Sequence, residues 1–143
     1  VQEDFAVDRV EITLRAATMG GDSPDCESEG THEVVLWVQS EQQPDVSPEM
    51  IVLSGDAASS FSARLQVDVS PPLEVLAGDR VFAGLRFQGP TPNISCLVGC
   101  TGGTRGENSW FSGASSAPFE WYGVRTFANT DLQISVHGNT TAP

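Results

Sequence analysis

Residues 61–70 of this 143-residue chain are FSARLQVDVS, a strict alternation of apolar and polar side chains. Successive side chains of a β-strand point to opposite faces, so this alternation predicts a strand with one buried and one wet face. The same period of two recurs over residues 10–15, 80–87 and 131–137. Two stretches, 34–38 and 50–53, are continuously apolar, which predicts strands that are covered on both faces.

Turn signals rich in Gly, Pro, Asp and Ser separate these stretches, and no window predicts an amphipathic helix. Pro71-Pro72 is expected to interrupt the strand pattern, because proline cannot donate to a β-ladder, leaving 73–76 as a short edge segment. About eight short strands without helices predict an all-β fold, an antiparallel β-sandwich over residues 9–138 with a C-terminal tail at 139–143. A jelly roll is the expected topology, because the Cys and Trp spacing of the rival immunoglobulin-like sandwich is missing.

Lysine is absent from the chain, and seven arginines stand against nineteen aspartates and glutamates, for a formal charge of -12. Nucleic-acid binding needs clustered positive charge, so nucleic acid is excluded as a partner, and an anionic membrane surface is disfavoured. No apolar run approaches the roughly 20 residues of a membrane span. The arginines within or beside the strands are expected to pair with nearby carboxylates on the sheet faces, at Arg9, Arg15, Arg64, Arg80 and Arg86.

The three cysteines are Cys26, Cys96 and Cys100. Their odd number fits no complete set of intrachain disulfides, and the pairing stays open: Cys96 with Cys100 across a turn, or one of them with Cys26. A disulfide would imply an oxidising compartment. The loop around Cys26 is a candidate calcium site, because its carboxylates supply oxygen ligands, at Asp22, Asp25, Glu27 and Glu29. A solvated acidic turn is the alternative interpretation of that loop.

Five aromatic residues lie in or beside a Gly- and Ser-rich stretch, at Trp110, Phe111, Phe119, Trp121 and Tyr122. Exposed rings on a sandwich form stacking platforms for sugar rings. Trp110, Trp121 and Tyr122 are therefore candidate binding residues for a polysaccharide. Packing of Trp110 and Trp121 in the core beneath the loop is the competing interpretation. Trp37, inside an apolar run, is expected in the core.

The apolar alternation shifts between Val7 and Val10, as a bulge or a break would make it do. A break would free residues 1–8 as an extended arm, with Phe5 and Val7 available to join the sheet edge of a neighbouring subunit. The alternative is an ordinary N-terminal strand. An arm of this kind predicts self-association, as in fibres built by strand exchange.

No arrangement of residues indicates catalysis, and we expect the protein not to be an enzyme. His32 and His137 fall at strand ends and match no metal-ligand pattern, and no Gly-x-Ser-x-Gly nucleophile motif is present. No cofactor is expected apart from the possible calcium ion.

The order of the strand segments carries a family resemblance. The run HEVVLWV at 32–38, a Pro-bounded loop, MIVLS at 50–54, the strand 61–69, the run 73–87, the segment 119–121 and the closing strand 131–137 follow one another in turn. Over residues 8–138 this order resembles β-sandwich modules of secreted and surface proteins from high-GC bacteria such as myxobacteria. The resemblance implies a secreted, extracellular location and carries no common activity. The leading expectation is therefore a structural or adhesive subunit of an extracellular assembly, and the alternative is a carbohydrate-binding module.

Overall fold

The computed structural model describes residues 1–16, 31–54, 64–88, 96–98, 100–102, 108–114, 116–123 and 130–141. All regular elements in these ranges are β-strands: β1 (Phe5–Ala16), β2 (Thr31–Gln39), β3 (Ile51–Ser54), β4 (Arg64–Val75), β5 (Arg80–Gln88), β6 (Cys96–Val98), β7 (Cys100–Gly102), β8 (Trp110–Phe111), β9 (Tyr122–Gly123), β10 (Thr130–Leu132) and β11 (Ile134–Thr140). The expected all-β class is confirmed. The described part of the chain has no helix of the length and apolarity needed to span a membrane.

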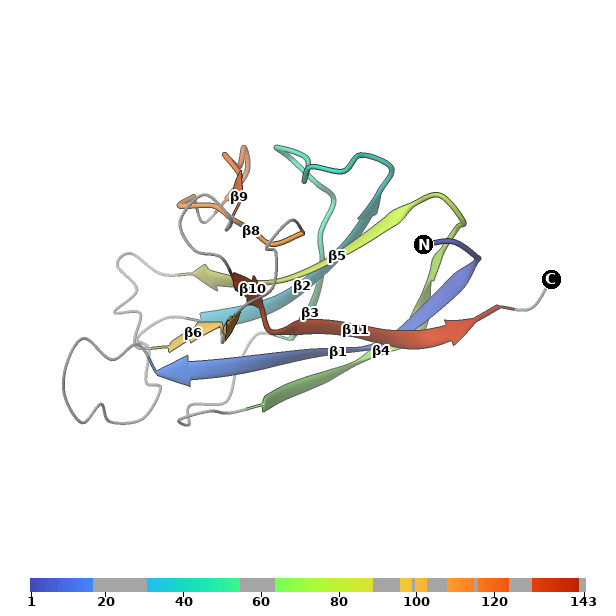
Figure 1. Ribbon diagram of the computed structural model, residues 1–143, viewed down its shortest axis with the longest axis horizontal. Coiled ribbons are helices and arrows are strands. Elements are labelled where there is room, and N and C mark those ends of the chain that lie inside the picture. Colours follow the sequence, from blue (N-terminus) through green and yellow to red (C-terminus); the bar gives the residue numbers. More distant parts are fainter. Residues whose placement is uncertain are drawn as a thin grey trace.

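Two antiparallel sheets form the sandwich. One has the strand order β11-β1-β4, with β6 joined to β1, and the other has the order β3-β2-β5. Figure 1 shows the two sheets as layers, with the short strands β8 and β9 above the outer side of the second sheet. The antiparallel sandwich is thus confirmed, and the jelly-roll topology stays a prediction.

The main core lies between the two sheets. It is built from alternate residues of β1, β2 and β4, namely Val7, Val10, Ile12, Val34, Leu36, Val69 and Val75. Val81, Ala83 and Leu85 of β5 and Ile134 and Val136 of β11 pack against this cluster. The period of two therefore selected the inward faces correctly. Each such aliphatic side chain stabilises the fold by about 1.5–3 kcal/mol when fully buried.

Residues 5–8 are not a free arm, and this corrects the sequence-based expectation. They begin β1, the central strand of its sheet, where Phe5 pairs with Val75 of β4 on one side and with Thr140 of β11 on the other. Val7 is fully buried in the core. The predicted shift of alternation is a β-bulge between Val7 and Arg9, and the strand continues through it.

The N-terminal segment before β1 is hydrogen-bonded to the turn between β4 and β5. The Val1 carbonyl accepts a hydrogen bond from Gly78 N at 3.0 Å, and the Val1 nitrogen donates to the Asp79 carbonyl. Ala77 N donates to Asp4 Oδ1 at 2.8 Å. Gly78 takes a φ of 99°, a left-handed conformation that glycine adopts without steric cost. The N-terminal segment thus closes one end of the sandwich.

Pro71-Pro72 does not end the strand, which corrects a second expectation. In β4, Leu73 pairs with Val7 and Asp68 pairs with Arg9, so residues 69–72 bulge opposite the single residue Asp8. Because β4 is the edge of its sheet and bulges here, the prolines leave no ladder donor missing.

Two further boundaries differ from expectation. Ile51 and Val52 in β3 are 43% and 48% exposed, so the apolar run 50–53 is not covered on both faces. It forms a short edge strand that pairs with β2. Asn139 and Thr140, expected in a tail, instead extend β11 and pair with Ala6 and Phe5.

Candidate functional site

A second apolar layer lies on the outer face of the sheet β3-β2-β5. In β2, Val34 and Leu36 belong to the main core, whereas the alternate residues Val35 and Trp37 point to the opposite face and are also buried. Strands β8 and β9 lie over this face (Figure 1). The prediction that 34–38 is covered on both sides is therefore confirmed, and Trp37 is buried in this second layer.

Stacked aromatic rings make up this layer. Trp37 stacks on Phe82 of β5 with ring centroids 5.2 Å apart, and on Trp121 at 5.9 Å. Phe119 packs against Trp121 at 5.2 Å. Aromatic pairs at these separations contribute about 0.5–1.5 kcal/mol each beyond the area they bury. The stack therefore holds the segment that leads into β9 firmly against β2 and β5.

Gln39, a buried polar residue at the end of β2, organises the loop beside the stack. Its Oε1 accepts hydrogen bonds from Trp37 Nε1 and Asp45 N, each at 3.0 Å. Its Nε2 donates to the carbonyls of Gln43 at 2.6 Å and Glu41 at 3.1 Å. One amide group thus satisfies four partners, which fixes the course of the chain from Gln39 to Asp45.

The same loop binds the segment before β9. Trp121 Nε1 donates to the Asp45 carbonyl at 2.7 Å, and Phe119 N donates to the Val46 carbonyl at 2.5 Å. Trp121 therefore has both its ring and its polar atom engaged within the molecule. This outcome agrees with the packing interpretation of Trp121 and removes it from the exposed platform.

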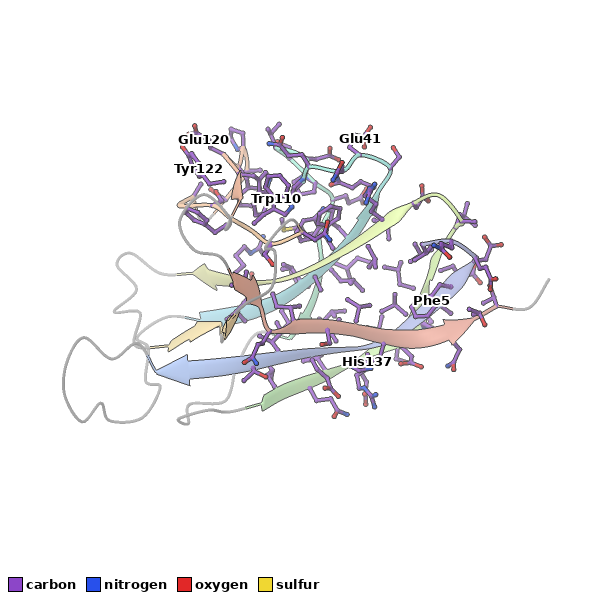
Figure 2. All side chains as sticks on the ribbon, in the orientation of Figure 1. Phe5, Glu41, Trp110, Glu120, Tyr122 and His137 are labelled. Atoms are coloured by element: carbon purple, nitrogen blue, oxygen red, sulfur yellow. The ribbon has the colours of Figure 1, made fainter. Side chains whose placement is uncertain are left out.

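The exposed rings are those of Phe111 and Tyr122. They are cross-strand partners in the β8–β9 pair, with ring centroids 5.5 Å apart and an angle of 30° between the ring planes. Phe111 is 40% exposed and Tyr122 is 41% exposed. Figure 2 shows Tyr122 and Glu120 together at the outer edge of the molecule. We call Phe111, Glu120 and Tyr122 the aromatic patch.

Glu120 raises the pKa of the neighbouring Tyr122. A hydrogen bond to the Glu120 side chain, a small desolvation effect and the negative charge of Glu120 together raise the pKa of the Tyr122 hydroxyl above its ordinary value of 10.0. The Tyr122 hydroxyl, which lies beside the negative charge of Glu120, is therefore harder to deprotonate than an ordinary tyrosine hydroxyl. The patch therefore combines two apolar ring surfaces with an anionic hydrogen-bond acceptor.

Trp110, the third predicted platform residue, lies beneath the patch. Its side chain is half-buried, and a Cβ added at Gly123 would lie 3.8 Å from the Trp110 ring. Its Nε1 is buried and finds no hydrogen-bond partner among the described residues. Of the three residues predicted from the sequence, Tyr122 alone is in the exposed pair. The second exposed ring belongs to Phe111 and not to Trp110 or Trp121. The sequence could not indicate which ring is exposed, because strands of two residues are too short to show an alternation of faces.

A polar cluster occupies the outer face of the other sheet. Arg9 Nε lies 3.5 Å from Glu11 Oε1, and His137 Nε2 lies 3.6 Å from Glu11 Oε2. Glu11 is only 8% exposed, so its charge is held between two basic groups. In the second sheet, Arg86 Nε donates to Glu33 Oε2 at 2.7 Å. The expected pairing of strand arginines with carboxylates is confirmed for Arg9 and Arg86.

The remaining candidate residues lie outside the described residues in whole or in part. Asp22, Asp25, Cys26, Glu27 and Glu29 fall between β1 and β2, in residues 17–30. The strands β6 and β7 contain the backbone of Cys96 and Cys100, and their side chains are not described. The calcium site and the disulfide pairing stay predictions. Within the described ranges, no group of three or more His, Cys, Asp and Glu residues could hold a metal ion.

No protein family model, no curated protein and no solved structure matches this chain. The site must therefore be interpreted from its own geometry.

Proposed function

We propose that this chain is a secreted, non-catalytic β-sandwich module that binds a polysaccharide through the aromatic patch. The observation that carries the proposal is the exposed pair Phe111 and Tyr122, two rings in contact and each about two-fifths exposed. Large aromatic side chains are highly buried on average. A pair of them held at the surface favours a role in binding.

The support beneath the pair strengthens this proposal. Phe111 and Tyr122 sit on paired strands, and the segment leading into β9 is fastened through Trp121 to Trp37 and Asp45. A binding site on supported elements loses less side-chain entropy when a ligand docks than a site on a free loop. The flat face of a sugar ring is apolar, so it can stack on such rings while its hydroxyls donate to Glu120.

The secreted and non-catalytic parts of the proposal rest on the sequence. The strand order over residues 8–138 resembles modules of secreted bacterial proteins, and the lysine-free composition with a charge of -12 suits a solvated outer surface. The sequence has no Gly-x-Ser-x-Gly motif, the nucleophile motif of α/β-hydrolases.

Titration of the protein with a panel of soluble polysaccharides tests the proposal, with tryptophan fluorescence and affinity electrophoresis as readouts. We expect binding that Phe111→Ala and Tyr122→Ala each weaken by about tenfold, because a lost aromatic stack is worth about 1–3 kcal/mol. Leu76→Ala is the matched control, since Leu76 is an exposed apolar residue, 62% accessible, on the β4–β5 turn. Unchanged binding by the double variant of Phe111 and Tyr122 would refute the site.

A second candidate function is self-assembly through a sheet edge, the role that the sequence first suggested. Residues 5–8 pair within their own sheet, so they are not available to a neighbouring subunit. Self-assembly is favoured instead by β3, an edge strand that has no charged residue and no proline and whose Ile51 and Val52 are exposed. Uncharged apolar edge strands are templates for pairing with another chain.

Sedimentation of the wild type, Val52→Arg and Val46→Arg tests this second function. Val46 is 60% exposed and lies outside any strand, so it controls for a new charge on the surface. Assembly through β3 requires that the wild type and Val46→Arg sediment as oligomers and that Val52→Arg does not. A monomeric wild type at high protein and salt concentration would eliminate this function.

A further inference from the structure

We infer that the aromatic patch selects a positively charged sugar, namely a polymer of amino sugars with free ammonium groups. This inference rests on the proposed polysaccharide-binding function and adds the chemical class of the ligand. It is argued from the rings, from Glu120 and from the charge of the whole chain.

The ring faces provide the first argument. The π face of an aromatic ring carries partial negative charge and attracts a cation placed over it. Phe111 and Tyr122 form a stacked pair with their centroids 5.5 Å apart, so an ammonium group can approach the outer face of one ring or of the other. A neutral sugar gains stacking from these rings, whereas a cationic sugar gains both stacking and electrostatic attraction.

Glu120 provides the second argument. It is exposed, it lies beside Tyr122 at the outer edge of the molecule (Figure 2), and it adds a full negative charge at the rim of the rings. Across the described residues 108–114 and 116–123, Glu120 is the one charged side chain. A hydroxyl and an ammonium can each donate a charge-assisted hydrogen bond to this carboxylate, but only the ammonium adds the attraction of a full opposite charge. The patch is therefore better matched to an ammonium than to a hydroxyl.

The charge of the whole chain provides the third argument. A formal charge of -12 over 143 residues attracts polycations over long range and repels polyanions such as uronic acid polymers. A neutral glycan receives no such assistance. The long-range field and the local patch thus favour the same class of ligand.

The test compares two oligosaccharides of equal length and linkage, the β-1,4 oligomers of glucosamine and of N-acetylglucosamine. They differ at each sugar in a charged amine versus a neutral amide. At mildly acidic pH and low salt we expect the glucosamine oligomer to bind about tenfold more tightly by calorimetry. Added salt should reduce this difference, because screening weakens the ionic part of the interaction.

Variants separate the patch from the general charge of the protein. Glu120→Gln is expected to weaken binding of the glucosamine oligomer by about two- to fivefold, as for an exposed ion pair, and so narrow the difference in affinity between the two ligands. Glu74→Gln removes the same charge from an exposed position on β4 and should leave the difference unchanged. If Glu74→Gln acts as strongly as Glu120→Gln, the preference belongs to net charge and the inference is wrong.

The remaining outcomes distinguish this inference from the function on which it rests. Equal affinity for the two oligomers, or binding of neutral glycans alone, overturns the cationic ligand and leaves the polysaccharide-binding function standing. Absence of binding to every glycan overturns both. Tight binding of the glucosamine oligomer that is lost in Tyr122→Ala supports both.

Discussion

Gly138 shows how closely two backbones approach in the first sheet. It pairs with Val7 beside the bulge of β1, and a Cβ at this position would lie 1.9 Å from the Ala6 carbonyl oxygen. No rotation of a side chain relieves that overlap, because the obstructing atom belongs to the backbone. Glycine is therefore required at position 138 because the Ala6 backbone leaves no room for a Cβ, and not because of an unusual backbone conformation.

We predict that Gly138→Ala lowers the free energy of unfolding by about 3 kcal/mol, at the upper end of the range for overpacking, because β1 and β11 must separate. Urea unfolding measures this change. Gly113→Ala is the control, since a Cβ at Gly113 meets no atom within 4 Å, and it should change stability by about 0.5 kcal/mol or less. Equal stability of the two variants would show that the strands are not as close as described.

Tyr122 offers a direct measurement at the patch, because it is the single tyrosine of the sequence. The hydrogen bond to Glu120, slight desolvation and the Glu120 charge raise its pKa above 10.0, so its deprotonation should require a higher pH. We predict that the tyrosinate absorbance of the wild type rises with a midpoint above 10.0. In Glu120→Gln the midpoint should move down, and in Glu74→Gln it should not.

Circular dichroism over the same pH range verifies that the titration reports on the folded protein. A midpoint that is identical in the wild type and in Glu120→Gln would mean that the two side chains are not in contact. The patch would then lack the anionic acceptor on which the ligand class depends.

At the scale of the elements, β1 organises the first sheet. It is the central strand, and its partners β4 and β11 come from the middle and the end of the chain. Its bulge at Asp8 lets the strand change register while Val7 and Val10 both stay in the core. Glu11 lies on the outer face of the same strand, where its carboxylate contacts the basic side chains of Arg9 and His137.

We predict that deleting residues 1–8 abolishes the cooperative thermal transition seen by circular dichroism. The deletion removes buried Val7, worth about 1.5–3 kcal/mol, together with backbone pairing on both sides of Phe5 and Ala6. That loss is large against the roughly 5–15 kcal/mol that stabilises a domain. Deleting only residues 1–3, which are exposed and precede β1, should preserve the transition. A truncation at residue 8 that melts like the wild type would restore the arm hypothesis.

β2 shows how one strand can serve two cores. Its even-numbered residues Val34 and Leu36 fill the space between the sheets, and its odd-numbered residues Val35 and Trp37 support the aromatic layer. Gly84 of β5 lies opposite Val35, and a Cβ at this position would make ordinary contacts with Val35 Cγ2 at 3.6 Å and Trp37 Cζ3 at 3.8 Å. The sandwich and the candidate site therefore share this strand, and damage to β2 is expected to affect both.

At the scale of the whole molecule, the dominant property is the charge of -12. Repulsion among like charges destabilises a compact state, and added salt screens it. Raising the ionic strength from about 0.01 M to about 1 M shortens the Debye length from about 30 Å to about 3 Å. Salt also weakens the attraction within ion pairs. The described ion pairs are too few for this loss to offset the stability gained from weaker repulsion.

We predict that the melting temperature at neutral pH rises by several degrees over that range of sodium chloride, about 3–5 °C for each 1 kcal/mol of relieved repulsion. Differential scanning calorimetry measures the shift. Near the sequence pI of about 4.2 the net charge vanishes, so the same salt should have a much smaller effect. A melting temperature that falls with salt at neutral pH would mean that attractive pairs outweigh the repulsion.

The sequence by itself determined where the main strands lie and which of their residues face the core. The predicted core-facing residues at 65–69, 81–85 and 134–136 proved correct, because the period of two is a local property of an extended backbone. The other face of 80–87 was expected to be wet, but Phe82 packs there against Trp37. The sequence also indicated that 34–38 is covered on both sides. Composition likewise predicts that nucleic acid is not a partner, because net charge can be counted without knowing the fold, and this stays a prediction.

Only the tertiary structure decided the pairing of residues 5–8 and the exposure of each aromatic ring. Phe5 meets Val75 and Thr140, and Trp121 donates to Asp45, which is 76 positions away in the sequence. No local pattern encodes such contacts, because they depend on which distant segments pack together. The same reason explains why Tyr122 and Phe111 are at the surface while Trp121, one residue from Tyr122, is held in the second layer.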